Sequence, residues 1–272
     1  MRNFLIWLTS SRTEPFDISF LSFWHIAYMV IIIAATIALG FYLNKKGPET
    51  SEKVLRILAY ALVIIYVGDF FVQPLFRDGE MNVDKLPFHI CTVLCPVVAF
   101  TTFNKKFQKI KEPVALLSIV APLMYLTYPG SAIGDISPFC YEILQTFIYH
   151  GVLFAWGFNM LASKTVIPNI RNCYKALIGI FMVAAWAFIG NFTYGVPYNY
   201  SDSDPHYDWF FVTGSTFSFV PTWLMPFAVV ASVFGMVMII YGLYYGFMNI
   251  KAKRAAAKAI PEEEEVKKEA TV

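Results

Sequence analysis

The sequence has few charged residues and no strong excess of either sign. Only 15% of its 272 residues are charged and 57% are hydrophobic, whereas about 25% charged residues is typical of soluble domains. Such a chain cannot cover its apolar surface with polar groups in water, which excludes a soluble α/β protein. The net charge of +2 is small, and we expect no nucleic-acid partner because the basic residues follow membrane topology instead.

Cysteines are also few, and their spacing lacks the paired pattern of a zinc site. Cys91 and Cys95 lie one helical turn apart in an apolar segment, while Cys140 and Cys173 are expected near opposite membrane faces. A disulfide framework is therefore not expected. We also predict no cofactor and no bound metal.

The chain instead has seven apolar segments, most of them close to the ~20 residues that cross a hydrocarbon core. The segments are Ser19–Leu43, Val54–Leu75, Leu86–Phe103, Pro113–Pro129, Phe139–Ala162, Tyr174–Val196 and Thr222–Met248. The sequence therefore predicts an all-α fold, a polytopic membrane helix bundle with seven transmembrane helices.

Basic residues are distributed unevenly between the connections of these segments. Of the 21 Lys and Arg residues, 17 fall in the connections after the first, third and fifth segments and in the tail after the seventh. By the positive-inside rule, the N-terminus lies outside and the C-terminus in the cytoplasm. This predicts a multi-pass protein of the cell membrane.

Three parts of the chain are distinguished by composition. Residues 1–18 are expected to lie along the outer interface, with Trp7 as an anchor. Residues 19–248 form the transmembrane domain. Residues 249–272 form a charged cytoplasmic tail that extends the last helix briefly and is then largely disordered, because it lacks apolar residues to bury. The tail needs no specific role, although a docking site for a soluble partner is the alternative.

Polar side chains in the spans are the main functional signal, because an ionisable group in hydrocarbon costs ~2.5–3.5 kcal/mol on insertion scales. With the assigned orientation, these residues share the outer half of the membrane, and the inner half is nearly free of such groups. This predicts one polar cavity open to the outer leaflet or outer solvent. The residues are Asp69, His89, Cys91, Glu142, Gln145, His150 and Asn191.

Most of these residues also have a purely structural explanation. His89 can begin a helix with Asp69 as its partner, Cys91 can pack as a small apolar residue, and Asn191 can join two helices by hydrogen bonds. His150 is harder to explain in this way, because a histidine near the bilayer midplane needs a hydrogen-bond partner.

The residue types favour two kinds of chemistry. A histidine beside a thiol can generate a thiolate nucleophile, so Cys91 with His150, oriented by Asp69 or Glu142, fits acyl transfer through a covalent intermediate. Alternatively, two histidines and a carboxylate can bind a metal or a phospholipid headgroup. Both alternatives depend on the shared depth of these residues in the membrane, and both stay open.

The longest outer connection, Pro197–Pro221, is rich in aspartate and aromatic residues and has no basic residue. It can form an interfacial aromatic belt with solvated acids. The functional interpretation is a lid over an outward-facing site. A cation site is less favoured, because the aspartates lack the regular spacing of a calcium loop.

Short motifs in the chain resemble those of the YwaF-type bacterial integral membrane proteins. The motifs are Leu86–Cys91, Phe147–Gly151, and Asn191 followed by Gly195 and Asn199–Tyr200. That group is distantly similar to a eukaryotic transmembrane family that transfers acyl chains between lipids with a cysteine and a histidine. The resemblance implies a functional role for His150. In the eukaryotic motif the cysteine directly precedes the histidine, a place that Phe88 holds here, so Cys91 lies out of register.

We therefore predict a membrane-embedded lipid-binding protein that can carry acyl-transfer or hydrolase chemistry, with membrane lipids as partners. His150 and Cys91 are the candidate catalytic residues, and whether the protein is an enzyme stays open. The alternative is a non-catalytic accessory subunit of a larger membrane complex such as a transporter, with a protein partner in the membrane. The candidate substrate-binding residues are Asp69, His89, Glu142, Gln145 and Asn191.

Other classes of membrane protein fit less well. A seven-span photoreceptor is disfavoured because the seventh span has no lysine to form a Schiff base. An ion-coupled carrier is expected to carry charged residues in both halves of its bundle, and here the charged residues of the spans lie in one half.

Overall fold

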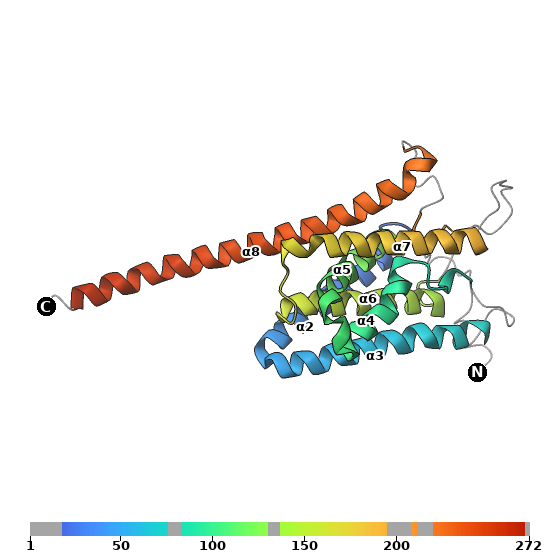
Figure 1. Cartoon of the computed structure of the whole chain (residues 1–272). Helices are drawn as coiled ribbons and strands as arrows, with labels where there is room; N and C mark the ends of the chain where they lie inside the picture. Colours follow the sequence, from blue (N-terminus) through green and yellow to red (C-terminus); the bar gives the residue numbers. More distant parts are fainter. Residues whose placement is uncertain (1–17, 76–82, 130–136, 195–207, 212–219, 270–272) are drawn as a thin grey trace.

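The computed structural model describes residues 18–75, 83–129, 137–194, 208–211 and 220–269 (Figure 1). Within these residues the fold is all-helical, as predicted, and the longer elements are seven α-helices. They are α2 (Phe23–Lys46), α3 (Pro48–Val72), α4 (Ile90–Phe103), α5 (Lys111–Thr127), α6 (Tyr141–Ala162), α7 (Cys173–Tyr194) and α8 (Met225–Glu269). The predicted interfacial segment with Trp7 lies outside the described residues.

Five helical segments of the described chain are long and apolar enough to cross a membrane. They are Phe23–Lys46, Pro48–Leu75, Lys105–Thr127, Ile170–Tyr194 and Met225–Ile250. The α4 helix is apolar but has only 14 residues, and α6 has 22 residues but includes Glu142, Gln145 and His150. The seven-span topology and its orientation therefore stay predictions.

The α4 helix begins later than the sequence predicted. Helix was expected from Leu86, but the residues up to His89 form turns, and His89 is the extended residue before the helix. Pro87 explains the difference, because the residue before a proline disfavours helical backbone angles. Only Ile90 and Cys91 of the motif Leu86–Cys91 therefore belong to α4, and the four residues before them precede the helix.

The α5 helix lies at the centre of the bundle. Its side chains from Pro113 to Pro122 are all buried, and it packs against α4, α6, α7 and α8. The contact with α6 is especially close at Gly157, where an added Cβ atom would lie 2.6 Å from the carbonyl oxygen of Ala115. Small residues allow such close approach of helix backbones in membranes.

The last helix is longer than the sequence predicted. α8 runs over 45 residues from Met225 to Glu269, which corresponds to about 68 Å at 1.5 Å per residue. It extends far beyond the other helices (Figure 1). A brief extension followed by disorder was expected after Met248, but the Ala, Lys and Glu residues of this segment are strong helix formers. The division of the chain into three parts stays a prediction.

Candidate functional site

Six polar side chains gather at one end of the bundle, and we call them the polar cluster: Asp69, Gln73, Lys85, Tyr141, Gln145 and Thr146. Asp69, near the end of α3, is only 2% exposed. Its carboxylate accepts hydrogen bonds from the Tyr141 hydroxyl at 2.9 Å and from Gln73 Nε2 at 3.2 Å. A buried carboxylate needs such partners, because an unpaired charge away from water is very costly.

Lys85 lies at the centre of the polar cluster. Its Nζ is 3.8 Å from Asp69 Oδ2 and donates to Gln145 Oε1 and to Thr146 Oγ1, both at 3.3 Å. The Lys85 carbonyl accepts a hydrogen bond from Tyr66 on α3 at 3.0 Å, which fixes the connection between α3 and α4. The Lys85 side chain is 23% exposed, whereas that of Asp69 is only 2% exposed.

His150 lies one helical turn further along α6 and is connected to the polar cluster through Thr146. His150 Nδ1 is 2.8 Å from the backbone oxygen of Thr146. A carbonyl only accepts hydrogen bonds, so Nδ1 carries the proton and Nε2 of the neutral ring keeps its lone pair. The ring stacks on Tyr125 of α5, with centroids 3.9 Å apart and planes at 10°. His150 is therefore held in one orientation.

Cys91 is buried in the first turn of α4. Its carbonyl oxygen accepts a hydrogen bond from Tyr149 at 2.7 Å, and Tyr149 directly precedes His150. This bond joins α4 to α6 beside both candidate catalytic residues. No hydrogen bond links the Cys91 thiol to His150, although the structure describes both residues. The structure thus places them on neighbouring helices without bringing them into direct contact.

His89 and Asn191 belong to a second group, which holds a short segment against the bundle. Asn191 Oδ1 accepts from the Trp209 amide at 2.8 Å, and its Nδ2 donates to Asp208 Oδ1 at 3.0 Å and to the Trp209 carbonyl at 3.1 Å. His89 Nδ1 accepts from the Phe210 amide at 3.5 Å. These contacts anchor η6 (Trp209–Phe211), as expected of structural hydrogen bonds in a membrane bundle.

The structure therefore divides the predicted site residues between two groups. Asp69 and Gln145 both contact Lys85, and His150 bonds the backbone of Thr146, whose hydroxyl also contacts Lys85. His89 and Asn191 instead hold η6. Glu142 lies in the first turn of α6 and is half-buried. The single polar cavity stays a prediction, and most of the predicted lid lies outside the described residues.

Four members of the polar cluster were not predicted from the sequence: Gln73, Lys85, Tyr141 and Thr146. Gln73 and Lys85 lie beyond or between the polar positions of the spans, although Lys85 directly precedes the motif that begins at Leu86. Tyr141 and Thr146 flank the polar positions of α6, but tyrosine and threonine are too common in membrane helices to stand out. Among the described residues, no three His, Cys, Asp or Glu side chains converge as metal ligands would.

A model of the TMEM164 family matches residues 20–245. The chain belongs to the TMEM164 family. This is a family of transmembrane proteins, so the match and the five apolar helices together indicate a membrane location. The matched region of this TMEM164-family protein contains the polar cluster, Cys91 and His150. Neither curated proteins nor solved structures gave a match.

Proposed function

We propose that this TMEM164-family protein binds a membrane lipid at the polar cluster and acts on its acyl ester through His150 and Cys91. The observation that supports this proposal is that Lys85 Nζ lies 3.8 Å from Asp69 Oδ2 and donates to the Thr146 hydroxyl, while the backbone oxygen of the same Thr146 accepts from His150. Burying an ionisable group in a membrane bundle costs free energy, so such groups are rare. Those that are present usually mark a functional site.

The polar cluster suits a phospholipid headgroup. The Lys85 ammonium can donate to a phosphate oxygen, and charge-assisted hydrogen bonds of this kind are stronger than neutral ones. Its hydrogen-bond acceptors, Gln145 and Thr146, are neutral and lie at 3.3 Å, so a phosphate oxygen can replace one of them while Asp69 stays 3.8 Å from Nζ. With the N-terminus outside and seven spans, as we propose, the ligand would come from the outer leaflet of the cell membrane.

The acyl chemistry would proceed in two steps. The Cys91 thiol gives its proton to His150 Nε2, and the thiolate attacks the ester carbonyl of the lipid. A carbon–sulfur bond forms, the ester carbon–oxygen bond breaks, and the leaving alkoxide takes the proton from His150. A second lipid hydroxyl, or water, then attacks the thioester and regenerates the thiol, which gives acyl transfer or hydrolysis. The first step requires α4 and α6 to bring the thiol and the imidazole within hydrogen-bond reach.

An acyl-exchange assay with purified protein and labelled phospholipid tests this proposal. We expect His150→Ala and Cys91→Ala to lower the rate, by roughly 100-fold or more for the histidine if it is a general base. Cys95→Ala is the matched control, since this buried cysteine lies one turn further along α4 and bonds only weakly to the Leu62 carbonyl at 3.8 Å. Full activity in both site variants would refute the catalytic proposal.

The length of α8 supports a second candidate function, an accessory role in a larger membrane complex. About 30 Å of helix crosses a hydrocarbon core, and α8 with its 45 residues has much more length than that. The projecting part offers a surface for a protein partner (Figure 1). We expect deletion of residues 251–272 to remove a stoichiometric co-purifying partner. A monodisperse monomer before and after the deletion would contradict this role.

A further inference from the structure

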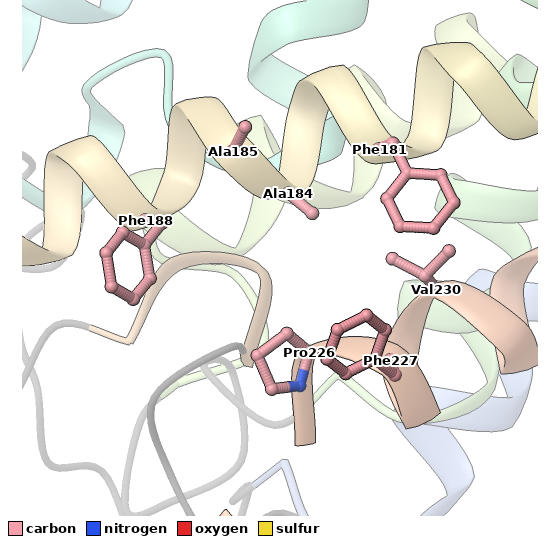
Figure 2. A pocket seen from close by; sticks show the side chains of 7 residues that line it. All are labelled: Phe181, Ala184, Ala185, Phe188, Pro226, Phe227 and Val230. Atoms are coloured by element: carbon pink, nitrogen blue, oxygen red, sulfur yellow. The ribbon is translucent and has the colours of Figure 1, made fainter. Parts of the chain in front are cut away.

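An apolar groove lies between α7 and α8 and is lined by no residue of the polar cluster (Figure 2). Its volume is about 280 Å³, and both helices that form it are candidate membrane spans. The α7 side of the groove lies near the middle of its span, whereas Pro226 and Phe227 lie in the first turn of α8. The groove therefore extends from one end of the α8 span into the hydrocarbon layer. The side chains that line it are all apolar: Phe181, Ala184, Ala185, Phe188, Pro226, Phe227 and Val230.

The groove follows the length of α7. The lining residues of α7 follow Phe181 at intervals of three, four and seven residues, so they form one stripe on the helix. They are Ala184, Ala185 and Phe188. Seven residues correspond to about 10 Å along the axis. The two phenylalanine rings stand at the ends, and the two alanines leave space between them (Figure 2). A groove along a membrane-spanning helix runs in the direction of the lipid chains.

The groove is a recess in a packed helix contact and not a gap between separated helices. Ala184 and Val230 line it and are themselves buried. Val183 and Ala187 on α7 and Val233 on α8 are buried as well, so the two helices hold the shape of the recess on both sides. Close packing of this kind keeps the recess open, because the packed side chains have little freedom to move into it.

We propose that this groove binds a single acyl chain of a membrane lipid. Its volume lies just below the ~300–1,000 Å³ of pockets for drug-sized ligands, which fits one chain and not a whole lipid. Its lining offers no hydrogen-bonding side chain, so a headgroup or a peptide backbone would lose its partners there.

A second copy of the chain fits this groove poorly. Transmembrane helices pair closely where small residues line their interface. Here three phenylalanine side chains border the groove and are about half exposed, with Phe181 at 46%, Phe188 at 53% and Phe227 at 58%. These rings keep a neighbouring helix backbone at a distance, while a thin hydrocarbon chain can lie between them.

The inference deepens the proposed lipid function and rests on it for the kind of ligand. Both walls of the groove, α7 and α8, contact η6, whose Phe210 amide donates to His89. The groove and the motif that leads into α4 therefore share a neighbour. α7 and α8 both pack on α5, which also contacts α4 and α6, so the groove is joined to the helices of the candidate site through α5.

Photo-crosslinking tests the groove directly. The full chain is placed in phosphatidylcholine nanodiscs that contain a phospholipid with a diazirine on its acyl chain, and labelled peptides are identified by mass spectrometry. We expect labelling to concentrate on α7 around Phe181–Phe188 and on α8 around Phe227, and to fall with excess unlabelled phospholipid. Ala185→Trp should lower this labelling several-fold, because Ala185 is exposed in the groove.

Ile189→Trp is the matched control, since Ile189 is 53% exposed on α7 but does not line the groove. Labelling spread evenly over α2, α3 and α7, or unchanged by Ala185→Trp, would overturn the inference. So would disulfide-linked dimers of a Phe227→Cys variant that exclude the lipid probe. If the Ala185→Trp variant does not fold, Ala185→Leu, which fills less of the groove, replaces it. This variant must also lower the labelling. Loss of acyl exchange in His150→Ala with groove labelling intact would separate the two proposals.

Discussion

Asp69 shows how the bundle accommodates a carboxylate at a depth where charge is costly. The carboxylate is 2% exposed, and it is satisfied by the Tyr141 hydroxyl, the Gln73 amide and the nearby Lys85 ammonium. Removing one partner of a buried pair leaves the other charge uncompensated, which costs more than the pair contributes. Lys85 is therefore a structural as well as a candidate ligand-binding residue.

We predict that Lys85→Ala destabilises the protein much more than Lys53→Ala. The Lys85–Asp69 pair has one member almost fully buried, whereas the Lys53–Glu49 pair at 2.9 Å has side chains 71% and 85% exposed. Breaking buried pairs costs ~3–5 kcal/mol. Lys85 is partly exposed and its Nζ lies 3.8 Å from Asp69 Oδ2, which should reduce this cost to about 1–3 kcal/mol.

Thermal unfolding in one detergent, monitored by tryptophan fluorescence, compares the two lysine variants. The Lys53→Ala variant should unfold close to the wild-type Tm, because exposed pairs are worth about 0–1 kcal/mol. Similar shifts for both variants would show that Asp69 does not depend on Lys85.

Part of the candidate site could be predicted from the sequence. The residues that could not be predicted were missed for a physical reason. Depth along the spans brought Asp69, Gln145 and His150 to one level, and the structure connects them. Depth does not define which way a side chain points, so it also grouped His89 and Asn191, whose partners in η6 are remote in sequence. Those partners could not be predicted from periodicity.

The contact between α5 and α6 depends on a glycine. We predict that Gly157→Ala destabilises the bundle by about 1–3 kcal/mol, the usual cost of overpacking, because its Cβ would lie 2.6 Å from the backbone oxygen of Ala115. Gly68→Ala is the control, since nothing lies within 4 Å of its added Cβ. The control should be neutral or slightly stabilising, because alanine favours helix by about 1 kcal/mol over glycine. Equal unfolding temperatures for both variants would contradict this.

Glu112, at the start of α5, joins three elements at the other end of the bundle. Its Oε1 accepts from the Asn169 amide at 2.7 Å and from the Tyr241 hydroxyl on α8 at 2.8 Å, and its Oε2 accepts from Asn172 Nδ2 at 2.7 Å. A carboxylate with several donors can hold a connection in place more firmly than a neutral acceptor.

We predict that Glu112→Ala loosens the connection between α6 and α7. Hydrogen exchange of the amides around Asn169 should become faster, because the variant removes the acceptor that holds them. Glu49→Ala is the control, since Glu49 pairs with Lys53 at an exposed site. Unchanged exchange near Asn169 in the Glu112→Ala variant would show that other contacts hold this connection.

At the level of elements, apolar runs predicted the order and approximate position of the seven α-helices of the described chain. Several helix ends were missed, among them the start of α3, which lies at Pro48 and not at Val54. Pro87 delays the start of α4, and the Ala, Lys and Glu composition after Met248 continues α8 to Glu269. Hydropathy identifies where a helix can cross a membrane, whereas helix ends depend on backbone propensities that it does not contain.

The topology of the whole molecule leads to a labelling prediction. In a variant without its native cysteines, Asp78→Cys should react with a membrane-impermeant maleimide added outside intact cells. Lys106→Cys, in the η3 segment (Lys105–Ile110) between α4 and α5, should react only after the cells are opened. This follows from the positive-inside rule. If Lys106→Cys reacted from outside and Asp78→Cys reacted only after the cells were opened, the bundle would have the opposite orientation. The polar cluster would then lie at the cytoplasmic side.

A density map of the full chain in nanodiscs of defined phospholipid tests the central claim most directly. We predict headgroup density within hydrogen-bond distance of Lys85 Nζ and an acyl chain that leads from it toward His150. A well-resolved map in which Asp69, Lys85 and His150 contact only protein atoms, with no lipid at the polar cluster, would contradict the proposed function.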